Sequence, residues 1–322
     1  MNRLILHIGP HKTGSTYIQR ELFNSKEKLL TNNLLYPSTM LEMFGHTGLA
    51  NSIKTNSLSD FKSEISDINN FSGDVILSSE NFFNLDELGI KILEESLEYN
   101  DVEIIVFYRQ PTIRLLSLWH EYVKSGMTLS YSEFSSRHIS KPFMSEELNI
   151  SIKLNLFLKY FKSGDVRIID YDESVANKNT LRSFMEAIGR KGLLDESYAV
   201  INKRINFYDL EVLRCLHHLS KGGELKGHAL RLKYFKNRYI FKEILDKRIF
   251  PFLSGNSIPL KIGGSFIDHA MADLMNNEYA FKVSNNGNFE IENILLPSSV
   301  WMLNLEMVSE IHGIYTMLVD MD

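Results

Sequence analysis

Four short apolar runs are spaced along the first 190 residues, and longer amphipathic stretches separate them. The runs lie at residues 4–8, 74–79, 103–108 and 166–170. Short apolar runs of this kind are typical of strands that are buried on both faces of a parallel sheet. The stretches with helical spacing lie at residues 15–30, 88–99, 111–124, 154–161 and 177–188. Strands that alternate with helices predict an α/β fold, with a parallel β-sheet flanked by helices.

The pattern changes after about residue 195, where helical spacing dominates. We predict helices at residues 208–219, 266–278 and 299–317, and a loop at residues 250–264. Residues 226–248 are markedly basic. Because no Pro- or Ser-rich linker divides the chain, we predict one domain over residues 1–322. It would have an α/β core at residues 1–195 and a mostly helical extension at residues 196–322.

The composition argues against several classes of protein. A strong basic excess is typical of nucleic-acid-binding proteins, so the net charge of −5 argues against that class. Cys215 is the single cysteine, which excludes an internal disulfide and a Cys-based zinc site. No apolar run approaches the roughly 18 residues of a membrane helix, and the first apolar run is too short for a secretory signal. We therefore expect a cytoplasmic protein.

The first apolar run leads into a segment with the features of a phosphate-binding loop. Gly9-Pro10 ends the run, and helical spacing starts at Ser15. Free N–H groups at the start of a helix, together with the positive end of its dipole, favour a bound anion. Gly14 allows an anion to approach the backbone closely, and Lys12 adds a positive charge. An ordinary strand–helix turn is the alternative interpretation.

The position of the lysine distinguishes this loop from that of nucleoside triphosphatases. Gly9 and Gly14 have the glycine spacing of the GxxxxGK[ST] motif. Ser15 nevertheless follows Gly14, and the lysine, Lys12, comes two residues before it. The segment therefore predicts an anion site of another kind.

A second anion site is predicted where the third apolar run ends. Arg109 follows that run, Pro111 stands in the first turn of the next helix, and Ser117 comes eight residues after Arg109. Ligands of open α/β sheets bind at the carboxyl ends of the strands, and a guanidinium can hold a phosphate with two hydrogen bonds. An arginine at a strand end with an unrelated surface serine is the alternative.

Together the two segments resemble the nucleotide-binding motifs of sulfotransferases that use 3′-phosphoadenosine 5′-phosphosulfate (PAPS). Arg109 and Ser117 match the site for the 3′-phosphate. The layout is similar over about residues 3–190, and the sequence looks most like prokaryotic members related to carbohydrate sulfotransferases. Ser15 stands where threonine is common, and it keeps the hydroxyl group. The residues that match the 5′-phosphosulfate loop are Lys12, Thr13, Gly14, Ser15 and Thr16, with His11 beside them.

This resemblance implies an activity and its partners. A sulfuryl group would pass from PAPS to an acceptor hydroxyl on a carbohydrate or glycolipid, which can lie at a membrane surface, and would leave 3′,5′-adenosine bisphosphate (PAP). No metal is required, because fixed cations and N–H groups can stabilise the developing charge. The family also has a basic, glycine-containing loop that closes over the nucleotide, and residues 223–228 are its nearest candidate here.

Glu80 is the predicted base for the acceptor hydroxyl. It directly follows the second apolar run, so it would lie at the same sheet edge as the loop at residues 9–16. By resemblance, members of the family carry a histidine or glutamate base, and carbohydrate-type enzymes commonly use glutamate. His46 is the rival, because an imidazole titrates near neutral pH. The alternatives are a helix N-cap or a surface charge for Glu80, and a capping or packing role for His46.

Two other functions stay open. An ATP- and Mg²⁺-dependent phosphotransferase would use the strand that ends at Asp170 as its metal-binding strand, although Lys12 is misplaced for that class. A catalytically silent nucleotide-binding protein is the second. The acceptor, the oligomeric state and the choice between Glu80 and His46 do not follow from the sequence.

Overall fold

The computed structural model describes residues 2–162, 164–196, 205–221, 223–282 and 291–321. The chain divides into two compact units. The first comprises Met1–Gln110, Glu146–Ile201 and Asp268–Asn288, and the second comprises Pro111–Ser145, Asn202–Ile267 and Phe289–Asp322. The division differs from the predicted one at residue 195, because the second unit includes the helix that follows the third apolar run.

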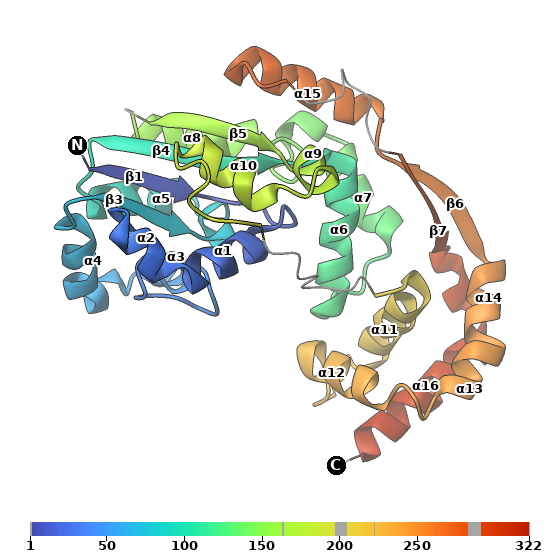
Figure 1. Cartoon of the computed structure of the whole chain (residues 1–322). Helices are drawn as coiled ribbons and strands as arrows, with labels where there is room; N and C mark the ends of the chain where they lie inside the picture. The colour runs from blue at the N-terminus through green and yellow to red at the C-terminus, as the bar shows by residue number, and fades with distance from the viewer. Residues whose placement is uncertain (1, 163, 197–204, 222, 283–290, 322) are drawn as a thin grey trace. The chain divides into compact units, whose positions relative to one another are not determined.

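The first unit is built on a parallel sheet (Figure 1). Within the described residues, its five strands lie in the order β2 (Leu34–Leu35), β3 (Asp74–Ser78), β1 (Arg3–His7), β4 (Asp101–Tyr108) and β5 (Asp165–Asp170). Leu4 of β1 lies beside Val75 of β3 and Val102 of β4. The four predicted strands and the α/β fold class are thus confirmed. β2 has two residues, which is too short to give a pattern.

Helices cover both faces of this sheet, which explains why the central strands carry apolar residues on both faces. Leu4 and Leu6 pack into one core cluster and Ile5 into the other, as expected for side chains that alternate along a strand. The first cluster contains residues of α3 (Thr47–Lys54), α5 (Glu87–Ser96), α8 (Ser151–Tyr160) and α15 (Phe266–Tyr279). The second contains residues of α1 (Ser15–Asn24), α2 (Lys26–Thr31) and α10 (Thr180–Ala187). The short elements of this unit are η1 (Leu58–Phe61), α4 (Lys62–Asn69), η2 (Glu80–Phe82) and α9 (Tyr171–Ala176).

The second unit is mostly helical and has its own core. Its larger helices are α6 (Pro111–Lys124), α7 (Tyr131–Ile139), α11 (Phe207–Leu219), α12 (Gly227–Asn237) and α16 (Leu305–Asp320). Its shorter helical segments are η3 (Pro142–Met144), α13 (Lys242–Ile244), η4 (Leu245–Ile249), α14 (Phe250–Gly255) and η6 (Ser299–Leu303). Leu216, Leu230 and Ile314 join α11, α12 and α16 in one apolar cluster.

The predicted loop at residues 250–264 is wrong. This segment forms α14 and then β6 (Ser257–Ile262), which pairs with β7 (Glu292–Pro297) in an antiparallel ribbon. Pro259 lies within β6, and a proline is tolerated there because a two-stranded ribbon has edges on both sides. Its partner strand, β7, begins about thirty residues further along the chain. No local sequence pattern therefore predicts β6. None of the described helices is long and apolar enough to cross a membrane.

Candidate active site

The order of the strands brings three of the predicted positions to one edge of the first unit. The loop between β1 and α1 (residues 8–14, here the β1–α1 loop) follows the central strand. Glu80 comes after β3 and Arg109 comes after β4, and these strands flank β1 on its two sides. Because all three strands are parallel, their carboxyl ends lie at the same edge, where such sheets bind ligands.

The β1–α1 loop is folded tightly onto itself. Thr13 is buried, and its hydroxyl donates to the carbonyl of Pro10 at 2.6 Å. Lys12 and Gly14 both have left-handed backbones, with φ of 71° and 77°. No side chain caps α1, and the N–H groups of Ser15 and Thr16 have no acceptor within a regular helix. The loop therefore presents helix N–H groups beside Lys12, as an anion site requires.

Gly14 is required by its surroundings as well as by its backbone angle. A Cβ atom at this position would lie 2.8 Å from Cε2 of Tyr171, the first residue of α9. The ring of Tyr171 therefore packs directly on the β1–α1 loop. A larger residue at position 14 would have to displace the ring and would also strain the backbone.

Arg109 reaches the same loop from the end of β4. Its Nη1 donates to the carbonyl of Lys12 at 2.9 Å, and its Nε lies 3.5 Å from Oδ1 of Asp172. The guanidinium also lies over the ring of Tyr171, 5.3 Å from the centroid. Lys12 and Arg109 are therefore neighbours at this edge, and Arg109 braces the loop. Its role as a ligand of the 3′-phosphate stays a prediction.

Ser117 belongs to the second unit, where it lies on α6. Its hydroxyl donates to the carbonyl of Ile113 at 3.1 Å, one turn earlier in the same helix. The predicted pairing of Ser117 with Arg109 on one phosphate stays a prediction.

Glu80 is held beside the β1–α1 loop. It is mostly buried, and one carboxylate oxygen accepts a hydrogen bond from Nε2 of Gln19 on α1 at 2.9 Å. Its Cα would lie 3.0 Å from a Cβ at Gly9, so the start of the loop packs on its backbone. Burial raises the pKa of Glu80. The Gln19 hydrogen bond, its own N–H and the nearby His11 and His7 outweigh this and leave the pKa below the ordinary value. The group is therefore a carboxylate at neutral pH.

His46 is a fully buried packing residue at the start of α3. Its Nδ1 accepts from the N–H of Ser78 at 3.1 Å, so Nε2 carries the proton and donates to the carbonyl of Pro37 at 3.1 Å. Burial lowers the pKa of His46 to about 4, against the effect of the two backbone hydrogen bonds. Both ring nitrogens are used within the protein, and this geometry favours Glu80 over His46 as the base.

The remaining predicted histidine, His11, lies within the loop, where Nε2 is 2.9 Å from the amide nitrogen of Asn84. Three further residues shape this edge and were not predicted: Gln19, Tyr171 and Asp172. Asp172 also accepts from the N–H of Gln110 at 3.0 Å. Gln19 is a buried polar residue on an otherwise apolar helix face, which is a usable signal. Tyr171 and Asp172 follow β5, and only the sheet order brings them to the loop.

Comparison with protein families finds no matching family, and comparison with curated proteins finds no relative. Among solved structures, the chain is similar to a sulfotransferase from Alicyclobacillus acidocaldarius. The two are 12% identical with a TM-score of 0.40, and the match covers 70% of this chain and 91% of the other. A likeness at this TM-score does not indicate a function for this chain.

Proposed function

We propose that this protein is a sulfotransferase that moves a sulfuryl group from PAPS to a hydroxyl of a carbohydrate or glycolipid. The observation that carries the proposal is the meeting of the β1–α1 loop and Arg109, joined by the 2.9 Å hydrogen bond to the carbonyl of Lys12. Two cationic side chains and a helix N-terminus lie together, with the Glu80 carboxylate following the neighbouring strand. This set of groups suits an anionic donor and an acceptor that must lose a proton.

The β1–α1 loop would hold the 5′-phosphosulfate. The N–H groups of Ser15 and Thr16 and the ammonium of Lys12 would stabilise the charge that develops on the phosphate as the sulfuryl group leaves. Gly14 gives the loop its left-handed turn and leaves room for the ring of Tyr171. No covalent step of the protein is needed, because positioning and charge stabilisation are the main requirements of such a transfer.

Glu80 would accept the proton of the acceptor hydroxyl. It is ionised at neutral pH, and the hydrogen bond from Gln19 fixes the direction of its carboxylate. Gln19 would thus be a positioning residue. Arg109 and Ser117 would bind the 3′-phosphate, exchanging their present hydrogen bonds to the carbonyls of Lys12 and Ile113 for bonds to the nucleotide.

The ATP-dependent phosphotransferase is disfavoured by the role of Asp170. Its side chain caps α9 by accepting from the N–H of Glu173 at 3.0 Å, which is a structural use of the carboxylate that would otherwise bind magnesium. The misplaced lysine in the β1–α1 loop points the same way.

The test has two parts that use the full chain. We expect PAP to bind in calorimetry with EDTA present, whereas an ATP enzyme would need Mg²⁺. We also expect labelled PAPS to transfer its label to members of a panel of cell-envelope glycans. Lys12→Ala should reduce both binding and transfer by about 10²-fold or more. The matched control is Lys28→Ala on the exposed side of α2. Failure of PAP to bind, or equal effects of the two variants, would refute the proposal.

A further inference from the structure

The second unit contains a pocket of about 360 Å³ that lies where the end of α6, the end of α11 and the start of α12 meet (here the α12 pocket). Its volume is at the lower end of the range for small-molecule sites. The side chains that line it include three hydroxyl groups, two lysines and one histidine: Ser125, Thr128, Ser220, Lys221, Lys226 and His217. No acidic residue is among the described residues that line it.

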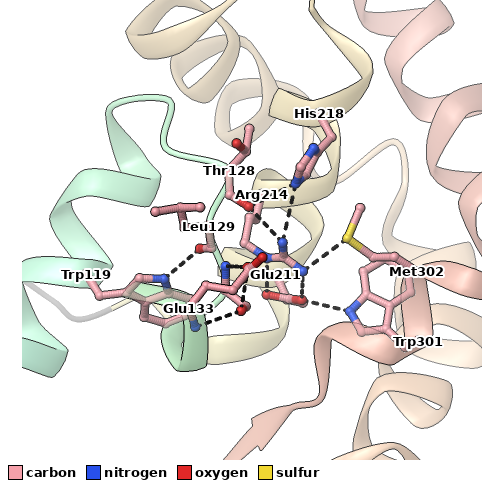
Figure 2. A network of polar contacts seen from close by, with 10 residues as sticks. Trp119, Thr128, Leu129, Glu133, Glu211, Arg214, His218, Trp301 and Met302 are labelled. Carbon is pink, nitrogen blue, oxygen red and sulfur yellow. Dashed lines mark hydrogen bonds and ion pairs between the residues drawn. The ribbon is translucent and has the colours of Figure 1, made fainter. Parts of the chain in front are cut away.

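A buried polar network fixes the wall formed by Thr128 (Figure 2). The carbonyl of Thr128 accepts from Nη1 of Arg214 at 2.8 Å and lies 2.9 Å from Nε2 of His218. Nε of Arg214 in turn donates to Glu211 at 2.9 Å, and the indole of Trp301 donates to the same carboxylate at 2.7 Å. Arg214 and Glu211 are almost fully buried, so the segment after α6 is held to α11 by groups that cannot move independently.

The start of α12 forms the opposite wall. Gly126 and Gly227 both have positive φ, and a Cβ at Gly126 would lie 3.3 Å from Cα of Gly227, so the two backbones touch. No side chain caps α12, which has eleven residues. Its first N–H groups are therefore available, and the helix dipole makes this end positive. Asp209 of α11 fixes the helix by accepting from Tyr234 and Arg238, both at 2.7 Å.

His217 is the observation that marks the pocket as a binding site. It is 4% exposed and lines the pocket, yet neither ring nitrogen makes a hydrogen bond of ordinary geometry among the described residues, and the ring has only a looser polar contact with the carbonyl of Val123. Burial lowers the pKa of His217 to about 4, although the nearby carbonyl of Val123 opposes this. A buried imidazole without a hydrogen bond is costly, and a ligand that accepts from it would remove that cost.

We propose that the α12 pocket binds the phosphate or sulfate group of a small molecule, such as a sugar ester. The N–H groups of α12, the hydroxyls of Ser125 and Thr128 and the imidazole of His217 supply donors from several directions, and Lys221 and Lys226 supply charge. The volume leaves room for a molecule attached to the oxyanion. The lining residues are not those proposed to hold PAPS in the β1–α1 loop or at Arg109 and Ser117, and Ser125 lies eight residues beyond Ser117, about 12 Å further along the axis of α6.

The first experiment measures binding to the full chain by calorimetry at constant ionic strength. The probes are inorganic phosphate, inorganic sulfate, glucose 6-phosphate, glucose 6-sulfate and glucose. We expect saturable binding of at least one sugar ester and none of glucose. Tighter binding of the phosphate or of the sulfate ester identifies the oxyanion. Absence of saturable binding for every anionic probe would overturn the proposal.

Charge variants locate that binding. Lys221→Gln and Lys226→Gln should each weaken it about tenfold, because each removes one charge beside the anion. The matched control is Lys236→Gln, an exposed lysine on α12 that does not line the pocket. Equal weakening by all three variants would mean a general attraction to the basic surface and would overturn the proposal.

Two further measurements separate this site from the proposed function. NMR of the His217 imidazole should show its pKa rising when the sugar ester is added, because a bound anion stabilises the protonated ring. Lys12→Ala, which should weaken PAP binding, should leave the binding of the sugar ester unchanged. Loss of that binding in Lys12→Ala, or an unaffected His217 signal, would overturn the proposal without bearing on sulfuryl transfer.

Discussion

The β1–α1 loop and the α12 pocket use the same elements in different ways. Each has an uncapped helix start, a glycine with positive φ and a lysine just before that glycine: Lys12 with Gly14, and Lys226 with Gly227. The loop comes from one stretch of seven residues that follows a buried strand. The pocket is assembled from three segments, at residues 125–128, 217–221 and 226–227. A contiguous anion site can be predicted from sequence, whereas an assembled one requires the packed helices.

The supports of the two sites differ as well. The loop stands on a sheet whose central strands are apolar on both faces. The pocket wall is attached to a buried ion pair, Arg214 with Glu211. Buried apolar contacts tolerate small changes, but a buried charge that loses its partner is strongly destabilising. Five substitutions test this comparison.

The largest effect is expected at Glu80. Glu80→Gln keeps the shape and the neighbour Gln19 but removes the base, so sulfuryl transfer should fall about 10²–10⁴-fold. The rate of label transfer from PAPS measures it, and binding of a sugar ester to the α12 pocket should not change. Glu87→Gln, on the exposed start of α5, is the control. A Glu80→Gln enzyme that retains most of its rate would refute the assignment of the base.

The next largest effect is expected at Glu211. Glu211→Leu leaves Arg214 buried without its partner and should cost about 3–5 kcal/mol of unfolding free energy. Both tryptophans of the chain, Trp119 and Trp301, lie in the second unit, so tryptophan fluorescence during urea unfolding reports on this unit alone.

Two variants control this result. Glu243→Leu breaks an exposed pair with Lys247 and should cost less than about 0.5 kcal/mol. The double variant Glu211→Leu with Arg214→Leu should be more stable than Glu211→Leu alone. If Glu211→Leu and Glu243→Leu lower the unfolding free energy by the same small amount, the buried pair does not support the pocket wall.

Gly14 and Gly227 allow the cost of a Cβ atom to be compared between the loop and the pocket. Gly14→Ala should cost about 2 kcal/mol and weaken PAP binding, because it strains a left-handed backbone and brings Cβ within 2.8 Å of Tyr171. Gly227→Ala should cost less, since its nearest neighbour would be the carbonyl of Ser125 at 3.5 Å. Hydrogen exchange of the β1 and β4 amides measures the loss of stability in Gly14→Ala. Tryptophan fluorescence during urea unfolding measures it in Gly227→Ala. A larger loss of stability in Gly227→Ala than in Gly14→Ala would contradict the tight packing described for the β1–α1 loop.

The smallest effect is expected from pH. Burial lowers the pKa of His46 to about 4, so the unfolded chain binds a proton first as the pH falls below about 6.5. Its contribution to stability is therefore complete above about pH 6.5 and is lost progressively toward pH 4. His46→Gln should flatten the pH dependence of the unfolding free energy by about 1 kcal/mol between pH 7 and pH 5.5. An unchanged slope would mean that His46 is not buried as a neutral ring.

Much of the first unit was predictable because its signals are local. The strands at residues 74–78 and 101–108 contain short apolar runs, and stretches with helical spacing separate them along the chain. The ribbon of β6 and β7 was missed, because its partners are far apart in the chain and partly exposed. The division into two units has no local signal, since α6 follows the sheet in sequence but packs with α11.

The α/β class, the β1–α1 loop and the positions of Lys12, Glu80 and Arg109 after the strands follow from the sequence alone. They depend on short-range spacing along the chain. Three features appear only in the folded protein: Arg109 braces the loop through the carbonyl of Lys12, both nitrogens of His46 are bonded to backbone, and His217 lines a pocket. Hydrogen-bond partners and burial arise when distant segments pack together, and no local pattern contains them.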